Sequence, residues 1–97
     1  RALAPSSEAS MAASLYRRIL DGEGDFHGTV KKPFLKHQIG SPVVRDLIKA
    51  ALKDSGGRYR DAFLLLRIPD KLYGATIQFL KRHECYLDFR PFRRKPL

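Results

Sequence analysis

The chain has 97 residues, of which 43% are hydrophobic, so it can form one small domain with a modest core. This length excludes a typical enzyme with a separate substrate domain, and the single cysteine, Cys85, excludes an internal disulfide framework. Nineteen Lys and Arg against ten Asp and Glu give a net charge of +9, an excess that usually reflects an anionic partner. RNA, an acidic protein and an anionic membrane surface are the candidate partners.

Residues 1–7 predict a flexible lead, and its Ala/Ser-rich composition with an arginine is compatible with the remnant of an organelle transit peptide. After it, apolar side chains recur every four residues, at Met11, Leu15 and Ile19. This spacing predicts one buried stripe on a helix that starts near Ser7, whose hydroxyl is a suitable N-cap. Gly22, within the sequence DGEGD, predicts the end of this helix.

A connector is expected over residues 25–40, where two glycines and a proline interrupt any helical pattern. The connector contains four apolar side chains, Phe26, Val30, Phe34 and Leu35. We expect a loop or an extended arm that these side chains pin to the core.

The clearest helix is predicted over residues 41–55. Ser41 is the expected N-cap, and Pro42 suits the first helical position because no N–H is needed there. The apolar side chains share one face, formed by Val43, Val44, Leu47, Ile48, Ala51 and Leu52. Gly56 and the glycine after it predict where the helix ends.

Two more helices are expected downstream. The segment YRDAFLLLRI is a short, very apolar helix that Pro69 closes, because the residue before a proline avoids the helical region. The segment DKLYGATIQFLKRHECYLDF predicts a last helix, in which Gly74 costs about 1 kcal/mol relative to alanine. A 4-3-4-3 spacing relates Leu72, Thr76, Phe79, His83 and Tyr86, which Leu80 and Leu87 join.

These elements predict an all-α domain of three to four helices over residues 8–88. An extended connector interrupts it, and an extended basic C-terminal tail follows over residues 89–97. The expected core consists of Met11, Leu15, Ile19, Val44, Leu47, Ile48, Leu52, Phe63, Leu66, Phe79 and Leu80.

The sequence lacks the patterns that carry catalysis. There is no glycine-rich phosphate loop after a strand, no Gly-x-Ser-x-Gly, and no pair of carboxylates on an apolar background. His83 and Cys85 are two residues apart, so on a helix they face different directions and cannot easily share a metal. We therefore expect no enzymatic activity, no metal and no cofactor, with His83 at the core edge and Cys85 as a small buried hydrophobe.

The positive charge is concentrated in two blocks, with a net +6 over residues 31–60 and a net +4 over residues 81–97. Aromatic side chains lie between the cations, as Tyr59, Phe89 and Phe92 do. Lys and Arg neutralise phosphates and aromatic rings stack on unpaired bases, so this pattern favours RNA backbone or an acidic protein surface, with a solvated basic face as the alternative. The candidate contact residues are Lys31, Lys32, Lys36, Arg58, Arg60, Arg90, Arg93, Arg94 and Lys95.

The stretch SLYRRIL contains the triplet Leu15, Tyr16 and Arg17. An amphipathic helix with a basic flank explains it without any further role. In a small, basic, helical chain this stretch also resembles the LYR-motif family of mitochondrial proteins. Residues 76–89 are loosely similar to the closing helix of the branch of that family that assists F1 ATPase assembly.

That resemblance implies a helical adaptor or subunit that binds the mitochondrial acyl carrier protein, with basic residues against the acidic helix of the carrier. It implies that Leu15 and Tyr16 support the bundle and that Arg17 faces the partner. We add Arg18 from its charge and position. The first helix of the family usually runs on past the motif, whereas Gly22 predicts an early end here.

A second resemblance is carried by RRIL and by FLKHQIGSPVV, which are similar to segments of a small-subunit protein of mitochondrial ribosomes. Both resemblances imply the mitochondrial matrix and a hetero-assembly rather than a homo-oligomer. We therefore expect a non-catalytic structural subunit of the mitochondrial ribosome, in contact with rRNA and ribosomal proteins.

The alternative is an LYR-type adaptor bound to acyl carrier protein in a respiratory complex or ATP synthase. A subunit lying on a membrane surface is a third possibility. No transmembrane segment is expected, because no apolar run approaches the 18–20 or so residues that span a bilayer.

Overall fold

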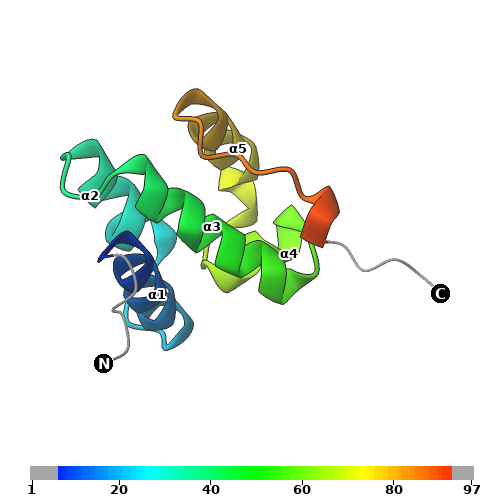
Figure 1. Ribbon diagram of the computed structural model, residues 1–97. Coiled ribbons are helices and arrows are strands. Elements are labelled where there is room, and N and C mark those ends of the chain that lie inside the picture. Colours follow the sequence, from blue (N-terminus) through cyan, green and yellow to red (C-terminus); the bar gives the residue numbers. More distant parts are fainter. Residues whose placement is uncertain (1–6, 93–97) are drawn as a thin grey trace.

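The computed structural model describes residues 7–92, with side chains from residue 11, and within that range the regular elements are helices and helical turns, without strands. The α-helices are α1 (Ser7–Leu20), α2 (Lys32–Leu35), α3 (Ser41–Ser55), α4 (Tyr59–Leu65) and α5 (Tyr73–Arg82) (Figure 1). A π-helical turn (His27–Lys31) precedes α2, and 3₁₀ turns cover Asp70–Leu72 and Arg90–Phe92. The all-α prediction is confirmed, with five α-helices in this range instead of three or four.

Helix α3 is central to the packing, and Figure 1 shows it passing through the middle of the molecule. Its side chains Val44, Leu47, Ile48 and Leu52 are almost completely buried, and the helix packs against both α1 and α4. Helices α4 and α5 add Phe63, Leu66, Phe79 and Leu80 to the same core. The predicted core from α3 to α5 is therefore confirmed.

The buried face of α1 differs from the predicted one. Met11 is 41% exposed and Leu15 is only half-buried, whereas Ala12 and Tyr16 are buried together with Ile19. Four residues advance a helix by 400°, so positions spaced strictly by four drift by about 40° at each step. The stripe that faces α3 therefore passes through residues 12, 16 and 19, and Met11 is a wrong core assignment.

Most of the expected extended connector is helical. The wide turn His27–Lys31 leads directly into α2, where Pro33 occupies the first turn. Phe26 is 2% exposed, and its backbone N–H donates to Leu66 O at 3.1 Å. The connector is thus a folded part of the domain, held to the end of α4 by this aromatic side chain.

The five α-helices of the described range end in the same way, with one residue in the left-handed region and a hydrogen bond from the next residue to a carbonyl five positions back. Glycine supplies the left-handed residue at Gly22 and Gly56, as the sequence predicts. The other three helices use His37 (φ 61°), Arg67 (φ 58°) and Glu84 (φ 59°). Side chains other than glycine are disfavoured in this region, so these three ends are under backbone strain.

These ends correct two predicted boundaries. Helix α4 stops at Leu65, before Pro69, because Arg67 turns the chain and Ile68 N–H donates to Phe63 O at 2.9 Å. Helix α5 stops at Arg82, and Cys85 N–H donates to Leu80 O at 2.7 Å, so Tyr86 is not helical.

At the start of α3, Gly40 is the N-cap, with extended backbone angles, instead of the expected Ser41. Within α5, a Cβ added to Gly74 would meet no atom within 4 Å, so close backbone packing does not require this glycine.

Glu84→Gly should raise the free energy of unfolding by about 1 kcal/mol, because glycine adopts the left-handed conformation without the Cβ penalty. Arg67→Gly should gain nothing or lose stability, because Arg67 Nε donates to Ile19 O at 2.9 Å and so links the ends of α1 and α4. Urea denaturation of both variants measures the contrast. Equal gains from the two substitutions would contradict a structural role for the Arg67 side chain.

Candidate anionic-partner interface

Three of the predicted contact residues gather around α2, and we call Lys31, Lys32 and Lys36 the α2 basic cluster. Lys32 and Lys36 are exposed, one helical turn apart, and Pro33 lies between them in the first turn of the short helix. Lys31 is partly buried, with Nζ 5.2 Å from the centre of the Phe79 ring. None of the three forms an ion pair within the described part of the chain. The charge of this cluster is therefore available to a partner.

A second set surrounds the start of α4, and we call Arg58, Arg60 and Arg90 the α4 basic cluster. Arg58 is exposed at the N-cap position. Arg60 NH1 lies 2.9 Å from Asp70 Oδ1, and Arg90 NH2 lies 3.0 Å from Asp88 Oδ2. Both pairs are solvent-exposed, so they contribute little to stability and a phosphate can replace either carboxylate.

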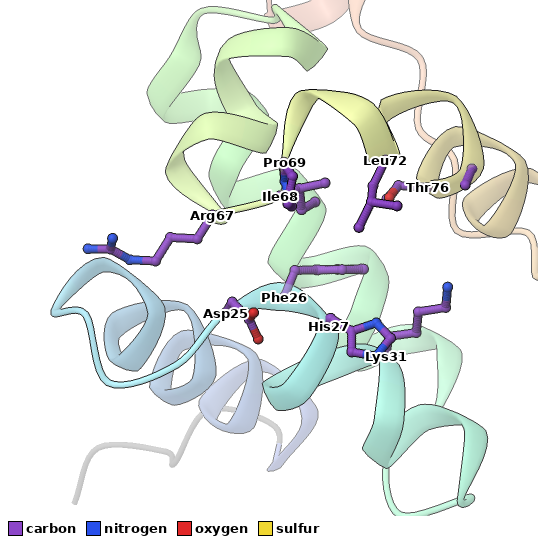
Figure 2. Close-up of a pocket in the computed structure, with 10 residues that line it drawn as sticks. Asp25, Phe26, His27, Lys31, Arg67, Ile68, Pro69, Leu72 and Thr76 are labelled. Atoms are coloured by element: carbon purple, nitrogen blue, oxygen red, sulfur yellow. The ribbon is translucent and has the colours of Figure 1, made fainter.

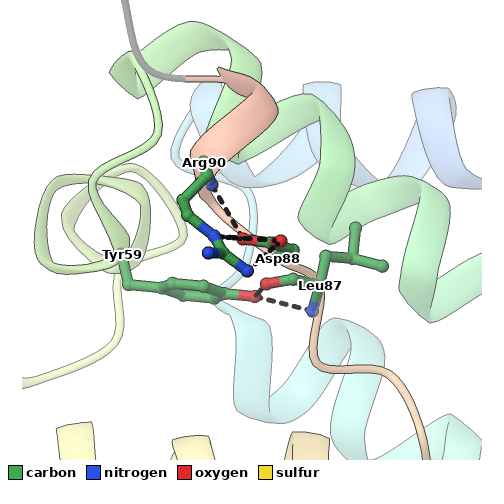
Figure 3. Close-up of polar contacts among 4 residues, drawn as sticks. All are labelled: Tyr59, Leu87, Asp88 and Arg90. Carbon is green, nitrogen blue, oxygen red and sulfur yellow. Dashed lines mark hydrogen bonds and ion pairs between the residues drawn. The ribbon is translucent and has the colours of Figure 1, made fainter.

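Tyr59 fastens the segment that carries Arg90 to α4 (Figure 3). Its hydroxyl donates to Leu87 O and accepts from Leu87 N–H, both at 2.8 Å, and its ring stacks on Tyr86 with centroids 4.9 Å apart. Burial raises the pKa of Tyr59 to about 12. The charged pair of Asp88 and Arg90 comes directly after Leu87, and hydrogen bonds from Arg90 lower the pKa of Asp88.

The two basic clusters lie at opposite ends of α3. Figure 1 shows α2 near the start of α3, and α4 and the turn Arg90–Phe92 near its end. The 15 residues of α3 span about 22 Å at 1.5 Å per residue. The structure thus places Arg58, Arg60 and the segment that carries Arg90 at the α4 end of α3, whereas the lysines of α2 lie at the other end. The predicted contacts Arg93, Arg94 and Lys95 lie outside the described residues.

The LYR-like triplet is divided between the core and the surface. Leu15 is half-buried against the core, and Tyr16 is buried with its hydroxyl donating to Asp54 Oδ2 at 2.7 Å. Burial and the Asp54 carboxylate both raise the pKa of Tyr16. Arg17 and the adjacent Arg18 are exposed on the last turn of α1, which ends at Leu20.

Other chemical groups are sparse in the described residues. His83 lies at the core edge between the rings of Phe34 and Phe79, and Cys85 is completely buried, which raises the pKa of its thiol. Residues 7–92 contain no cluster of three His, Cys, Asp or Glu side chains placed to hold a metal ion. No helix in this range has the length and apolar character needed to cross a membrane.

Sequence reasoning missed two hollows beside α5. One, of about 280 Å³, lies between residues 25–31 and residues 67–76 (Figure 2), and the other, of about 360 Å³, lies between α2 and α5. Leu35 and Leu72 line them and are exposed, and Arg82 lines the second hollow. The only signal in the sequence is leucine beside cations, which does not by itself separate a groove from a core position.

Comparison with known proteins found no matching family model, no similar curated protein and no similar solved structure. Both family resemblances therefore depend on the short sequence segments that carry them.

Proposed function

We propose that the chain is a non-catalytic subunit of the mitochondrial ribosome that holds rRNA backbone and neighbouring proteins. The observation that carries this proposal is that the α2 and α4 basic clusters lie at opposite ends of α3, a helix about 22 Å long. A small anionic ligand cannot reach both clusters, whereas a polyanion with regularly spaced phosphates can. The resemblance of RRIL and FLKHQIGSPVV to segments of a ribosomal small-subunit protein supports the mitochondrial assignment.

The contacts that this surface supports are to phosphates more than to bases. The exposed cations of this surface include Lys32, Lys36 and Arg58. Hydrogen bonds from such side chains to phosphates position a protein on the nucleic acid backbone without reading its sequence. Tyr59, a stacking candidate from the sequence, is only 6% exposed and holds Leu87. It is therefore occupied within the fold and does not offer a face to an unpaired base.

Lys32→Glu with Lys36→Glu should weaken binding of the chain to a labelled RNA stem-loop by roughly tenfold or more. It should also make the slope of log K against log salt less steep by about 2, because the two lost phosphate contacts no longer release counterions on binding. Fluorescence anisotropy at several salt concentrations measures both quantities. The matched control is Arg17→Glu with Arg18→Glu, which changes the net charge equally at the end of α1. Equal weakening by both double variants would mean that net charge alone, and not the α2 basic cluster, binds RNA.

The assembly itself is tested by sedimentation. Tagged chain expressed in mitochondria should sediment with the small ribosomal subunit at moderate salt, and ribonuclease treatment should release it. Sedimentation with a respiratory complex alone would contradict the ribosomal proposal.

A second candidate function is an LYR-type adaptor that binds acyl carrier protein. The exposure of Arg17 and Arg18, with Tyr16 packed inward, favours it, because this is the division of roles that the family resemblance implies. The two functions are compatible, since a ribosome can recruit such an adaptor.

Arg17→Glu with Arg18→Glu should abolish co-purification of acyl carrier protein, because it places two carboxylates against the acidic helix of the carrier. Lys32→Glu with Lys36→Glu is the matched control for charge and should retain the carrier. Full recovery of carrier with the Arg17 and Arg18 double variant would exclude this second function.

A further inference from the structure

Two neighbouring hollows lie along one side of α5. The two hollows beside this helix share Lys31 and Ala75 as lining residues, so they adjoin. Figure 2 shows Phe26 in the centre of the first hollow, with Arg67 at one end and Lys31 at the other. We call this surface the α5 groove and define it by Phe26, Lys31, Leu35, Leu72, Ala75 and Arg82.

The groove combines apolar ends with positive charge. Leu72 is 39% exposed at one end and Leu35 is 53% exposed at the other, so two leucine side chains meet solvent in the same depression. Lys31 and Arg82 line it, and Asp25 is the one carboxylate among its lining residues. Arg67 also lines it, but its guanidinium is directed to the end of α1, where Nε donates to Ile19 O at 2.9 Å. Asp25 Oδ1 already accepts the backbone N–H of Gly28 at 2.8 Å. A complementary ligand is therefore apolar on one side and acidic at its edges.

The aromatic rings of the groove do not suit RNA. Phe26 is 2% exposed and Phe79 is 7% exposed, and the Lys31 ammonium lies over the Phe79 ring. Among the aromatic rings that line the groove, only His27 is exposed. Successive bases need successive open ring faces, which this surface lacks. Protein is therefore a better occupant than single-stranded RNA.

We propose that the α5 groove binds an acidic amphipathic helix of a partner protein. The distance along α5 from Leu72 to Arg82 is about 15 Å at 1.5 Å per residue, which accommodates about three turns of a bound helix. Apolar side chains at every third or fourth position of that helix contact Leu35 and Leu72, and its glutamates face Lys31 and Arg82. This inference does not depend on RNA binding, because Leu35 and Leu72 carry no charge.

The test uses the full chain and a fluorescein-labelled designed peptide of about 15 residues, with leucines on one helical face and glutamates on the other. Anisotropy should show saturable binding to the wild-type chain. Leu35→Ser with Leu72→Ser should weaken it by about tenfold or more, because two exposed leucines lose their apolar contacts. Arg82→Gln should weaken binding less than the double leucine variant does. Its effect should be larger at low salt than at high salt, because salt screens the lost charge.

Leu64→Ser is the matched control, because Leu64 is 67% exposed on α4 and does not line the groove. It should leave peptide binding unchanged, and the Leu35 and Leu72 double variant should keep its RNA affinity, which separates this proposal from the ribosomal one. Circular dichroism confirms that each variant is folded.

The proposal is overturned if the peptide does not bind, if a peptide with the leucines scattered around the helix binds equally, or if Leu64→Ser weakens binding as much as the double variant. Displacement of the peptide by a single-stranded RNA oligonucleotide, with RNA affinity lost in the double variant, would assign the groove to RNA and also overturn it.

Discussion

Phe26→Ala should lower the free energy of unfolding by about 3–5 kcal/mol, which is a large part of the stability of a domain of this size. Phe26 is 2% exposed and packs edge-on against Phe79 with ring centres 6.4 Å apart. Its own backbone N–H donates to Leu66 O. Removing the ring leaves a cavity beneath the first hollow, and the helical turns on either side cannot collapse into it without losing that hydrogen bond. Guanidinium denaturation gives the change.

Leu64→Ala is the control for Phe26→Ala, because Leu64 is 67% exposed and its loss should change stability by less than about 0.5 kcal/mol. If both substitutions cost the same, the connector is not packed as described. If Phe26→Ala lowers only the m-value, the substitution has changed the compactness of one of the two states instead of removing core packing.

Phe26 also shows how far the sequence predicts the connector. The sequence identifies this residue as an apolar pin, and the structure buries it. The sequence does not predict the helical turns around it, because His27–Lys31 has no 3.6-residue apolar pattern and contains a glycine that disfavours helix. Burial of Val30 and Phe26 stabilises that turn, and such tertiary packing overrides the local preference of the segment.

Some of the helix ends are likewise predictable from the sequence, and others are not. Gly22 and Gly56 are predictable because glycine adopts positive φ without penalty. Arg67 and Glu84 adopt positive φ because the next residues along the chain, Ile68 and Cys85, are buried in the core. A pattern of residue types along the chain does not contain that information, so the sequence predicts a last helix that is too long.

For the candidate interface, composition predicts the cations but not their pairing. The basic block over residues 31–60 is divided between the two clusters, and Arg90 of the second block belongs to the α4 basic cluster. Arg60 and Arg90 are paired with carboxylates ten and two residues away. The α5 groove depends on three separate segments meeting beside α5, which only the tertiary structure shows.

Tyr59→Phe should lower the free energy of unfolding by about 2 kcal/mol, because the N–H and the carbonyl of Leu87 lose their shared hydroxyl partner. The ring and its stacking on Tyr86 are retained, so the loss reports the hydroxyl alone. Residues 85–92 should then exchange their amide hydrogens faster than α3 does, because the hydroxyl fastens this segment to α4. Hydrogen exchange measured by NMR on both proteins shows whether the effect is confined to that segment.

The pH dependence of the Tyr59→Phe effect separates this hydroxyl from a general loss of packing. Burial raises the folded-state pKa of Tyr59 to about 12, against about 10 in the unfolded chain. Below pH 10 both states hold the proton, so the stabilisation is complete. Between about pH 10 and 12 the unfolded phenol ionises first, and the stabilisation is lost as the pH rises.

The difference in stability between wild type and Tyr59→Phe should therefore be constant up to about pH 9 and narrow above pH 10. A difference that stays constant to pH 12 would contradict the burial of the Tyr59 hydroxyl in the folded chain, because burial is the cause of its raised pKa.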